Sequence, residues 1–197
     1  MFERRFLIPR TLSFVMSPSA IVLQGGEEVR IRTNKTLFEK LAAASRKGKI
    51  MVVPWTSDTK KKELEYRTLL QQYFTDSGFR EVLFLEEDDT SADTRKKISS
   101  VDVVYLPGGD PEILYEKMKA RSLENELINF EGTLVGNSAG AIVLSRGSYH
   151  DGKFYPGFGL IGFYVSVHYE LGENVPSSTG LTPCINLPEN MWVTVTT

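Results

Sequence analysis

The sequence predicts an α/β fold: a three-layer sandwich in which helices cover both faces of a mostly parallel central sheet. Short apolar runs rich in Val, Ile and Leu alternate with stretches of helical periodicity, and several runs are apolar at consecutive positions. Strands buried on both faces of a parallel sheet have this pattern, and the helices between them provide right-handed crossovers.

Five apolar runs are expected to form the sheet: Ala20–Leu23, Ile50–Val53, Val82–Leu85, Val101–Leu106 and Leu134–Val135. The clearest helix lies between the second and third runs, where apolar residues from Tyr66 to Phe74 recur at helical spacing and Gly78 ends the pattern. Weaker helical stretches follow the other runs, at Leu37–Leu41, Ser91–Ser99 and Pro111–Met118.

The pattern changes after Leu144. Closely spaced glycines separate short β-like pieces, which we interpret as hairpins or edge strands that complete the same domain: Tyr164–Val167, Cys184–Leu187 and Trp192–Val195. Residues 16–197 are therefore expected to form one domain. The basic and apolar residues 1–15 form an N-terminal arm, either an added strand or a disordered extension, because Pro9 and Arg10 interrupt the apolar core that a signal peptide needs.

Composition excludes several classes of function. The 197 residues carry a formal net charge of −2, and 41% are hydrophobic, which suits a soluble protein with no general attraction to nucleic acid or anionic membranes. The single cysteine cannot form an internal disulfide or a cysteine zinc cluster, and two histidines cannot supply a three-histidine metal site. We expect a cytoplasmic protein without a metal or an organic cofactor.

The strongest functional motif is G-N-S-A-G at residues 136–140. It lies between the apolar run that ends at Val135 and the helical stretch Ala139–Leu144, which is the strand–turn–helix context of a G-x-S-x-G nucleophile elbow. Flanking glycines allow a tight turn, and the helix N-terminus favours negative charge beside Ser138. The motif therefore predicts a nucleophilic serine; the alternative interpretation is a tight turn whose small residues serve packing alone.

A second turn, L-P-G-G-D-P at residues 106–111, also joins a strand to a helix. The backbone N–H groups of Gly108, Gly109 and Ala139 are candidates for an oxyanion hole, because the carboxyl edge of an open α/β sheet is where ligands bind. Asp110 and Asn137, which adjoin the two turns, are candidates for substrate contact. Asp110 is equally suited to capping the helix that follows it.

A nucleophilic serine needs a base, and the sequence offers only His150 and His168. We favour His168, because it ends a β-like run and strand ends collect at the edge that holds the elbow. The orienting acid stays open at this point, since Asp151 and Glu170 could each bind the Nδ1–H of the histidine. Cys184 lacks a surrounding turn and is interpreted as a small buried residue.

These motifs, in the order LPGGDP, GNSAGA and VHYE, resemble the dipeptidase E family of serine peptidases, which includes aspartyl dipeptidases and cyanophycinases. The resemblance spans about Ala20 to Val195 and implies the flavodoxin-like fold of class I glutamine amidotransferases. It implies Ser138 as nucleophile, His168 as base and the Gly108–Gly109 turn as part of the oxyanion hole. The family order favours Asp151 as the acid, whereas the related amidotransferases favour Glu170.

The resulting hypothesis is a serine peptidase that cleaves amide bonds of small peptides and possesses no nucleic-acid or membrane partner. Aspartyl specificity is not supported, because residues 171–187 contain no Lys or Arg to hold an acidic side chain. Domains of this size often form homodimers. The alternatives are an esterase of another serine-hydrolase class and a non-catalytic binding or regulatory member of the same fold; a dinucleotide-binding protein is disfavoured because the glycine fingerprint is absent.

Overall fold

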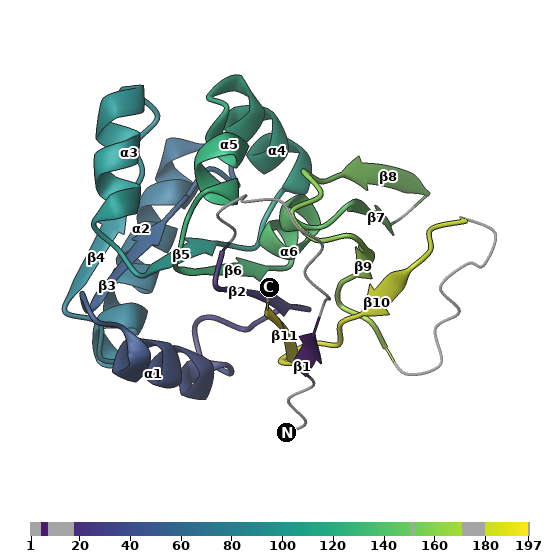
Figure 1. The fold of residues 1–197 in the computed structure, drawn as a ribbon, viewed down its shortest axis with the longest axis horizontal. Helices are drawn as coiled ribbons and strands as arrows, with labels where there is room; N and C mark the ends of the chain where they lie inside the picture. Colours follow the sequence, from purple (N-terminus) through teal and green to yellow (C-terminus); the bar gives the residue numbers. More distant parts are fainter. Residues whose placement is uncertain (1–4, 8–17, 151, 171–179, 197) are drawn as a thin grey trace.

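The computed structural model describes residues 5–7, 18–150, 152–170 and 180–196. Its centre is a seven-stranded sheet in the order β1-β11-β2-β6-β5-β3-β4 (Figure 1). The five strands from β2 to β4 along this order are parallel to their neighbours, whereas β11 runs antiparallel to β2. The predicted α/β class with a mostly parallel central sheet is therefore confirmed.

The parallel strands form where the apolar runs predict them, within a few residues at each end. They are β2 (Ala20–Gln24), β3 (Lys49–Val52), β4 (Glu81–Phe84), β5 (Val103–Leu106) and β6 (Thr133–Asn137). The helices are α1 (Lys35–Ala44), α2 (Lys60–Asp76), α3 (Ser91–Ser99), α4 (Pro111–Ala120), α5 (Leu123–Ile128) and α6 (Ala139–Leu144). The short helix α5 was not expected, because six residues are too few to show a clear period.

The sheet separates two hydrophobic clusters. Along β2, Ile21 and Leu23 join the cluster that includes α4, α5 and α6, whereas Val22 joins the cluster that includes α1 and α2. This alternation follows from the two-residue period of a strand. Both faces are thus covered by helices, which explains why the central strands are apolar at consecutive positions.

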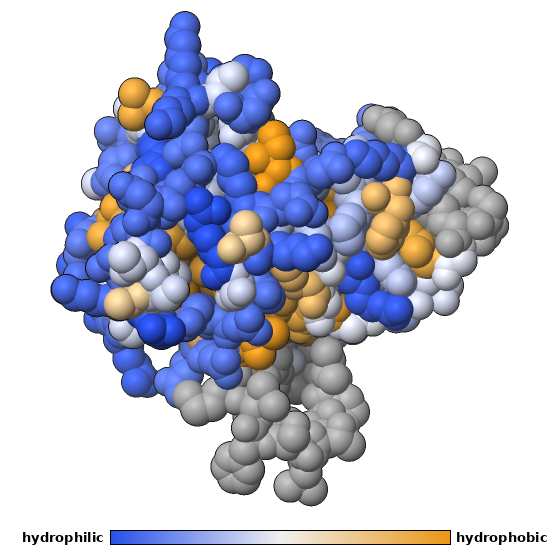
Figure 2. Space-filling view, turned by 90° about the horizontal axis from the view of Figure 1, so that it is seen from above, coloured by the Kyte–Doolittle hydropathy of each residue, from blue (hydrophilic) through white to orange (hydrophobic). Residues whose placement is uncertain are grey.

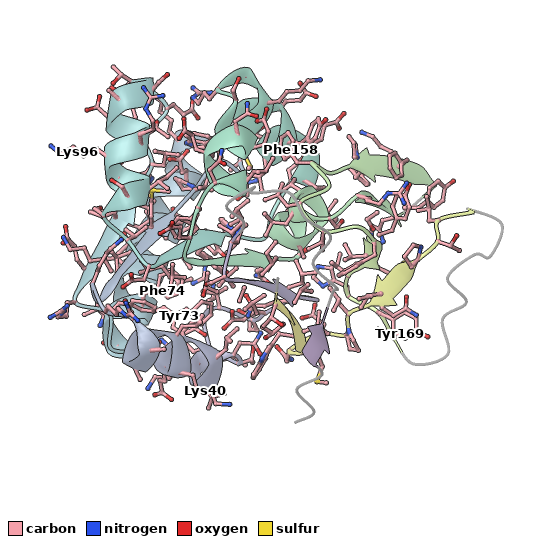
Figure 3. The ribbon with its side chains drawn as sticks, in the orientation of Figure 1. Lys40, Tyr73, Phe74, Lys96, Phe158 and Tyr169 are labelled. Atoms are coloured by element: carbon pink, nitrogen blue, oxygen red, sulfur yellow. The ribbon has the colours of Figure 1, made fainter. Side chains whose placement is uncertain are left out.

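Aromatic rings fill the space between the sheet and the helices α1 and α2. The ring centroid of Phe38 on α1 lies 4.8 Å from that of Phe74 and 5.2 Å from that of Tyr73, both on α2. Figure 3 shows Tyr73 and Phe74 between α1 and the sheet. Tyr105 of β5 completes the group, with its ring centroid 5.1 Å from that of Phe74. The predicted apolar stripe of α2 therefore faces the core.

The described C-terminal part contains two small two-stranded sheets and the last strand of the central sheet. β7 (Gly147–His150) pairs with β8 (Lys153–Pro156) as an antiparallel hairpin, and β9 (Tyr164–Ser166) pairs with β10 (Cys184–Asn186) in parallel. The last strand, β11 (Trp192–Thr196), returns to the central sheet beside β2. Because it is antiparallel, its first residue lies opposite the last residue of β2, Gln24.

The N-terminal arm contributes one described strand, β1 (Arg5–Leu7), which pairs in parallel with β11 at the edge of the sheet. The remaining residues of the arm, 1–4 and 8–15, lie outside the described residues. The face shown in Figure 2 is largely hydrophilic, with smaller groups of apolar residues between the polar ones. Among the described helices, none has the length and apolar character that crossing a bilayer requires.

Candidate active site

Ser138 occupies a tight turn between β6 and α6. Its backbone has φ 47° and ψ −104°, a conformation that residues with a side chain rarely adopt. This turn has room only for glycines at its two flanking positions. A Cβ atom at Gly140 would lie 2.0 Å from the Leu106 carbonyl oxygen, and one at Gly136 would lie 2.5 Å from the Gly140 carbonyl oxygen. The close approach of the turn to β5 therefore requires Gly140, and the tightness of the turn itself requires Gly136.

His168 follows β9 and reaches the serine across the sheet edge. The His168 Nε2 atom lies 2.7 Å from Ser138 Oγ, a hydrogen-bonding distance. The backbone N–H of His168 donates to the Gly25 carbonyl oxygen at 2.8 Å, which ties the histidine to the turn after β2. The other histidine, His150, ends β7, where its side chain is exposed.

The Nδ1 atom of His168 contacts the carboxylate of Glu189 through Oε1. The sequence motifs did not point to this residue. Of the two acids that they suggested, Glu170 has an exposed side chain two residues beyond the histidine, and Asp151 lies outside the described residues. Ser138, His168 and Glu189 thus form a continuous series of contacts in the order hydroxyl, imidazole, carboxylate.

Glu189 reaches this edge because it precedes an antiparallel strand. The parallel strands bring their carboxyl ends to the site, whereas β11 brings its beginning there, with Trp192 opposite Gln24. The only sequence signal for it was Pro188–Asn190, a polar turn between two β-like pieces. Such a turn points to the site only in combination with the direction of β11.

The turn at Gly25 and Gly26, after β2, packs against His168 and the segment that carries Glu189. Gly25 N–H donates to the Met191 carbonyl oxygen at 3.1 Å, and Asn190 N–H donates to the Gly26 carbonyl oxygen at 2.9 Å. A Cβ atom at Gly26 would lie 2.6 Å from His168 Nδ1 and 2.5 Å from Glu189 Oε2. The turn after β2 therefore lies against both members of the pair.

The Gly108–Gly109 turn lies beside the serine. A Cβ atom at Gly108 would lie 3.5 Å from the Ser138 Cβ, and Gly109 has φ 134°, which favours glycine. Ala139 is the first residue of α6, where a backbone N–H has no carbonyl available within the helix. Asp110 caps α4, because its Oδ1 accepts the N–H groups of Glu112 and Ile113 at 2.8 and 3.1 Å.

A cavity of about 670 Å³ opens beside Ser138 and His168. Both residues adjoining the turns, Asn137 and Asp110, line it. The remaining walls come from the turn after β2, the loop from β3 into α2, the first part of α2, the loop from β5 into α4 and the start of α4. They are Glu27, Pro54, Thr56, Ser57, Asp58, Lys62, Glu63, Tyr66, Gly108, Gly109 and Ile113. The carboxyl edge of the sheet is thus hollowed where the predicted site residues meet.

One carboxyl group in this cavity has a perturbed proton affinity. Burial raises the pKa of Glu27 above its ordinary value, although three donors partly oppose that rise: the Tyr73 hydroxyl, the Asn34 N–H and the Gln24 amide. Perturbed carboxyl groups in a cleft are typical of functional sites. Within the described parts of the chain, no group of three or more His, Cys, Asp and Glu side chains is arranged to hold a metal ion.

Cys184 lies on β10, outside this cavity. Its side chain is half-buried, and burial raises the pKa of its thiol. A raised pKa disfavours the thiolate, which is the nucleophilic form of cysteine.

Comparison with known proteins identifies a family and two similar structures. The sequence matches the family described as Peptidase family S51 over residues 18–196. No curated protein matches it. Among solved structures, a peptidase from an acI-B1 Actinobacterium is similar, with 20% sequence identity, a TM-score of 0.72, and coverage of 91% of this chain and 84% of that one.

A putative peptidase E protein from Listeria monocytogenes EGD-e is also similar, with 16% identity, a TM-score of 0.64, and coverage of 91% of this chain and 98% of that one. At these identities the two structures support the fold. The family match covers nearly the whole domain, and it confirms the resemblance drawn from the three motifs. The chain belongs to peptidase family S51 and is a serine-type peptidase.

Proposed function

We propose that this peptidase cleaves amide bonds of small peptides through an acyl-enzyme on Ser138. The observation that carries the proposal is the 2.7 Å separation of Ser138 Oγ and His168 Nε2. At this distance the imidazole can remove the hydroxyl proton as the oxygen attacks a carbonyl carbon. A serine at the elbow and a histidine in contact with a carboxylate reproduce the arrangement of hydrolytic triads on other folds.

In the first half-reaction, Ser138 Oγ bonds to the substrate carbonyl carbon and its proton moves to His168 Nε2. The tetrahedral intermediate collapses when the C–N bond breaks, and the imidazolium gives the same proton to the departing amine. Water then attacks the ester with His168 again as base, which releases the carboxylic acid and restores the serine. Glu189 keeps the Nδ1–H of His168 oriented and stabilises the imidazolium.

The oxyanion is assigned to backbone donors. The Ala139 N–H lacks an acceptor within α6, and the Gly108–Gly109 turn stands beside Ser138. Loss of one such donor typically raises the barrier by about 2.7–4 kcal/mol. Asn137 and Asp110 line the cavity that would hold the peptide.

The first experiment compares Ser138→Ala with the unchanged protein on a dipeptide library. Loss of the nucleophile is expected to lower kcat on the order of 10⁶-fold. His168→Gln should abolish turnover as well, whereas His150→Gln, in the only other histidine of the chain, should leave it intact. Dipeptide hydrolysis that persists at the same rate in Ser138→Ala would disprove the mechanism.

Two further measurements separate the alternatives. An esterase would turn over p-nitrophenyl esters while leaving every dipeptide intact. A non-catalytic member of the fold would fail to react with a fluorophosphonate probe, whereas the proposed enzyme is labelled at Ser138 and protected by a peptide substrate.

We place this activity in the cytoplasm, because one cysteine in 197 residues gives no sign of the disulfides common in oxidising compartments. Cell fractionation tests the location. The homodimer that the size of the domain suggests is tested by light scattering after gel filtration.

A further inference from the structure

We propose that the cavity beside Ser138 contains a subsite for a primary ammonium group of the substrate, formed by the Glu27 carboxylate, the Asn137 side-chain oxygen and the Tyr66 ring. The inference rests on the proposed peptidase function. It specifies which chemical group of a peptide the cavity holds.

The topology brings these groups to one place. Asn137 ends β6, and Glu27 lies three residues beyond the end of β2. β2 and β6 are neighbours, with Gln24 opposite Asn137. Glu27 and Asn137 therefore emerge from adjacent strands at the edge that also holds Ser138, and all three residues line the same cavity.

Glu27 is a fixed acceptor. Its Oε1 accepts the Tyr73 hydroxyl at 2.5 Å and the Asn34 N–H at 3.1 Å, and its Oε2 accepts the Gln24 amide at 3.4 Å. Tyr73 stays protonated as a donor, because burial and the nearby Glu27 charge raise the pKa of its phenol far above the ordinary value. Three donors on one carboxyl group favour the ionised form.

This carboxylate has no protein counterion in the described part of the chain, where the ion pairs within 4 Å do not include Glu27. Arg32, whose guanidinium lies over the ring of Tyr73, pairs instead with Asp76. A partly buried carboxylate without a counterion is unfavourable, and an incoming cation relieves that cost. Burial accordingly raises the pKa of Glu27 in the protein as it stands.

Asn137 supplies an independent observation. Its side chain is 2% exposed and lines the cavity, yet its Oδ1 has no hydrogen-bond partner within normal distance and angle among the described residues. A buried acceptor left unpaired costs free energy until a donor reaches it. A primary ammonium has three N–H donors, which suits a carboxylate oxygen and an amide oxygen together.

Tyr66 completes the subsite, because it lines the same cavity. It lies within the electrostatic influence of Glu27, whose charge contributes to a raised pKa of the Tyr66 phenol. Aromatic rings attract cations through their negative faces. The carboxylate and the amide oxygen can accept hydrogen bonds from an ammonium ion, and the aromatic ring can attract its charge.

The other charges around the cavity do not favour an anionic substrate. Lys62 is the one cation among the described lining residues. The Glu63 carboxylate is paired with Arg67 at 2.7 Å, so that guanidinium is already occupied. Asp110 is engaged in capping α4. Substrates that bring a positive charge to Glu27 should therefore bind better than acidic ones.

A peptide offers a primary ammonium from two sources, its free α-amino terminus and a lysine side chain. Four peptides distinguish them: norleucyl-alanine, lysyl-alanine and the N-acetyl form of each. Norleucine matches the length of the lysine chain without its charge. N-acetyl-norleucyl-alanine carries no ammonium and is the reference ligand.

The experiment measures binding by calorimetry at pH 7 in the Ser138→Ala protein, with and without Glu27→Gln. Glutamine keeps an oxygen for Tyr73 and Asn34 but removes the charge. Binding of each ammonium peptide that uses the subsite should weaken about 10- to 100-fold, and binding of the uncharged reference should not change. A loss confined to free N-termini assigns the α-amino group, and a loss confined to lysine peptides assigns the side chain.

Glu28→Gln is the matched control, because it removes the same charge from the neighbouring exposed residue outside the cavity. Asn137→Ala is a second variant, expected to weaken ammonium binding severalfold; the melting temperature of each variant shows that it folds. Equal affinity of the Glu27→Gln and Glu27 proteins for all four peptides overturns the subsite, as does equal loss for the uncharged reference or no binding at all. Charge-dependent binding without hydrolysis by the Ser138 protein instead disproves only the proposed peptide cleavage.

Discussion

Gly26 lies directly against the imidazole of His168: a Cβ atom at position 26 would stand 2.6 Å from Nδ1, inside the contact distance of any real Cβ. The same atom would stand 2.5 Å from the Oε2 of Glu189. A glycine in the turn after β2, more than 140 residues away in sequence from His168, is thus part of what holds the imidazole and the carboxylate together.

Gly26→Ala is therefore expected to separate His168 from Glu189 while leaving the Ser138 turn intact. Turnover should fall mainly through kcat, with little change in KM, because the substrate cavity keeps its walls. The pH dependence of kcat/KM should change as well, since the imidazole loses its carboxylate partner. Steady-state kinetics between pH 5 and 9 measures both.

Gly162→Ala is the control for this substitution, because a Cβ atom there meets nothing within 4 Å. It should match the unchanged protein in every kinetic parameter. A Gly26→Ala protein with an unaltered kcat and pH profile would show that the turn does not position the pair.

Glu189→Gln tests the acid. Glutamine retains the shape of the side chain but cannot stabilise an imidazolium, so kcat should fall on the order of 10³- to 10⁴-fold. Glu170→Gln and Asp151→Asn, the two acids that sequence patterns suggest, should each change kcat far less. The reverse ranking would assign the role to one of those two residues.

Glu27 predicts a change of stability with pH. Because the pKa of Glu27 is raised by folding, the folded state binds its proton more tightly than the unfolded state does. The associated stability is fully present below the ordinary carboxyl pKa and is lost as the pH rises through the raised value.

Glu27→Gln removes this dependence. The melting temperature of the unchanged protein should therefore fall relative to that of the variant as the pH rises from below 4.5 toward neutrality. Paired thermal melts over this range measure the difference, and Glu28→Gln again serves as the charge control. A difference that stays constant with pH would contradict the raised pKa.

Gly140→Ala tests the packing behind the serine turn. Its Cβ atom would lie 2.0 Å from the Leu106 carbonyl oxygen, a backbone atom that cannot move without displacing β5. Overpacking of this kind typically costs about 1–3 kcal/mol of unfolding free energy. Urea denaturation should show this loss in Gly140→Ala and none in Gly162→Ala.

The sequence alone determined the fold and part of the site. Consecutive apolar residues in five short runs are typical of strands covered on both faces, and these runs form the parallel centre of the sheet. Gly136 and Gly140 marked the turn of Ser138 because close backbone approach excludes a side chain there. The presence of only two histidines in the chain restricted the choice of base to His150 and His168.

Tertiary structure alone decided which acid meets His168 and what else surrounds Ser138. Glu189 has no motif around it, and it reaches the site because β11 is antiparallel and starts where β2 ends. Glu27 likewise became notable only through its burial and the donors Tyr73, Asn34 and Gln24 around it. Local patterns report on neighbours in sequence, whereas these contacts depend on strand direction and strand order, which are properties of the whole chain.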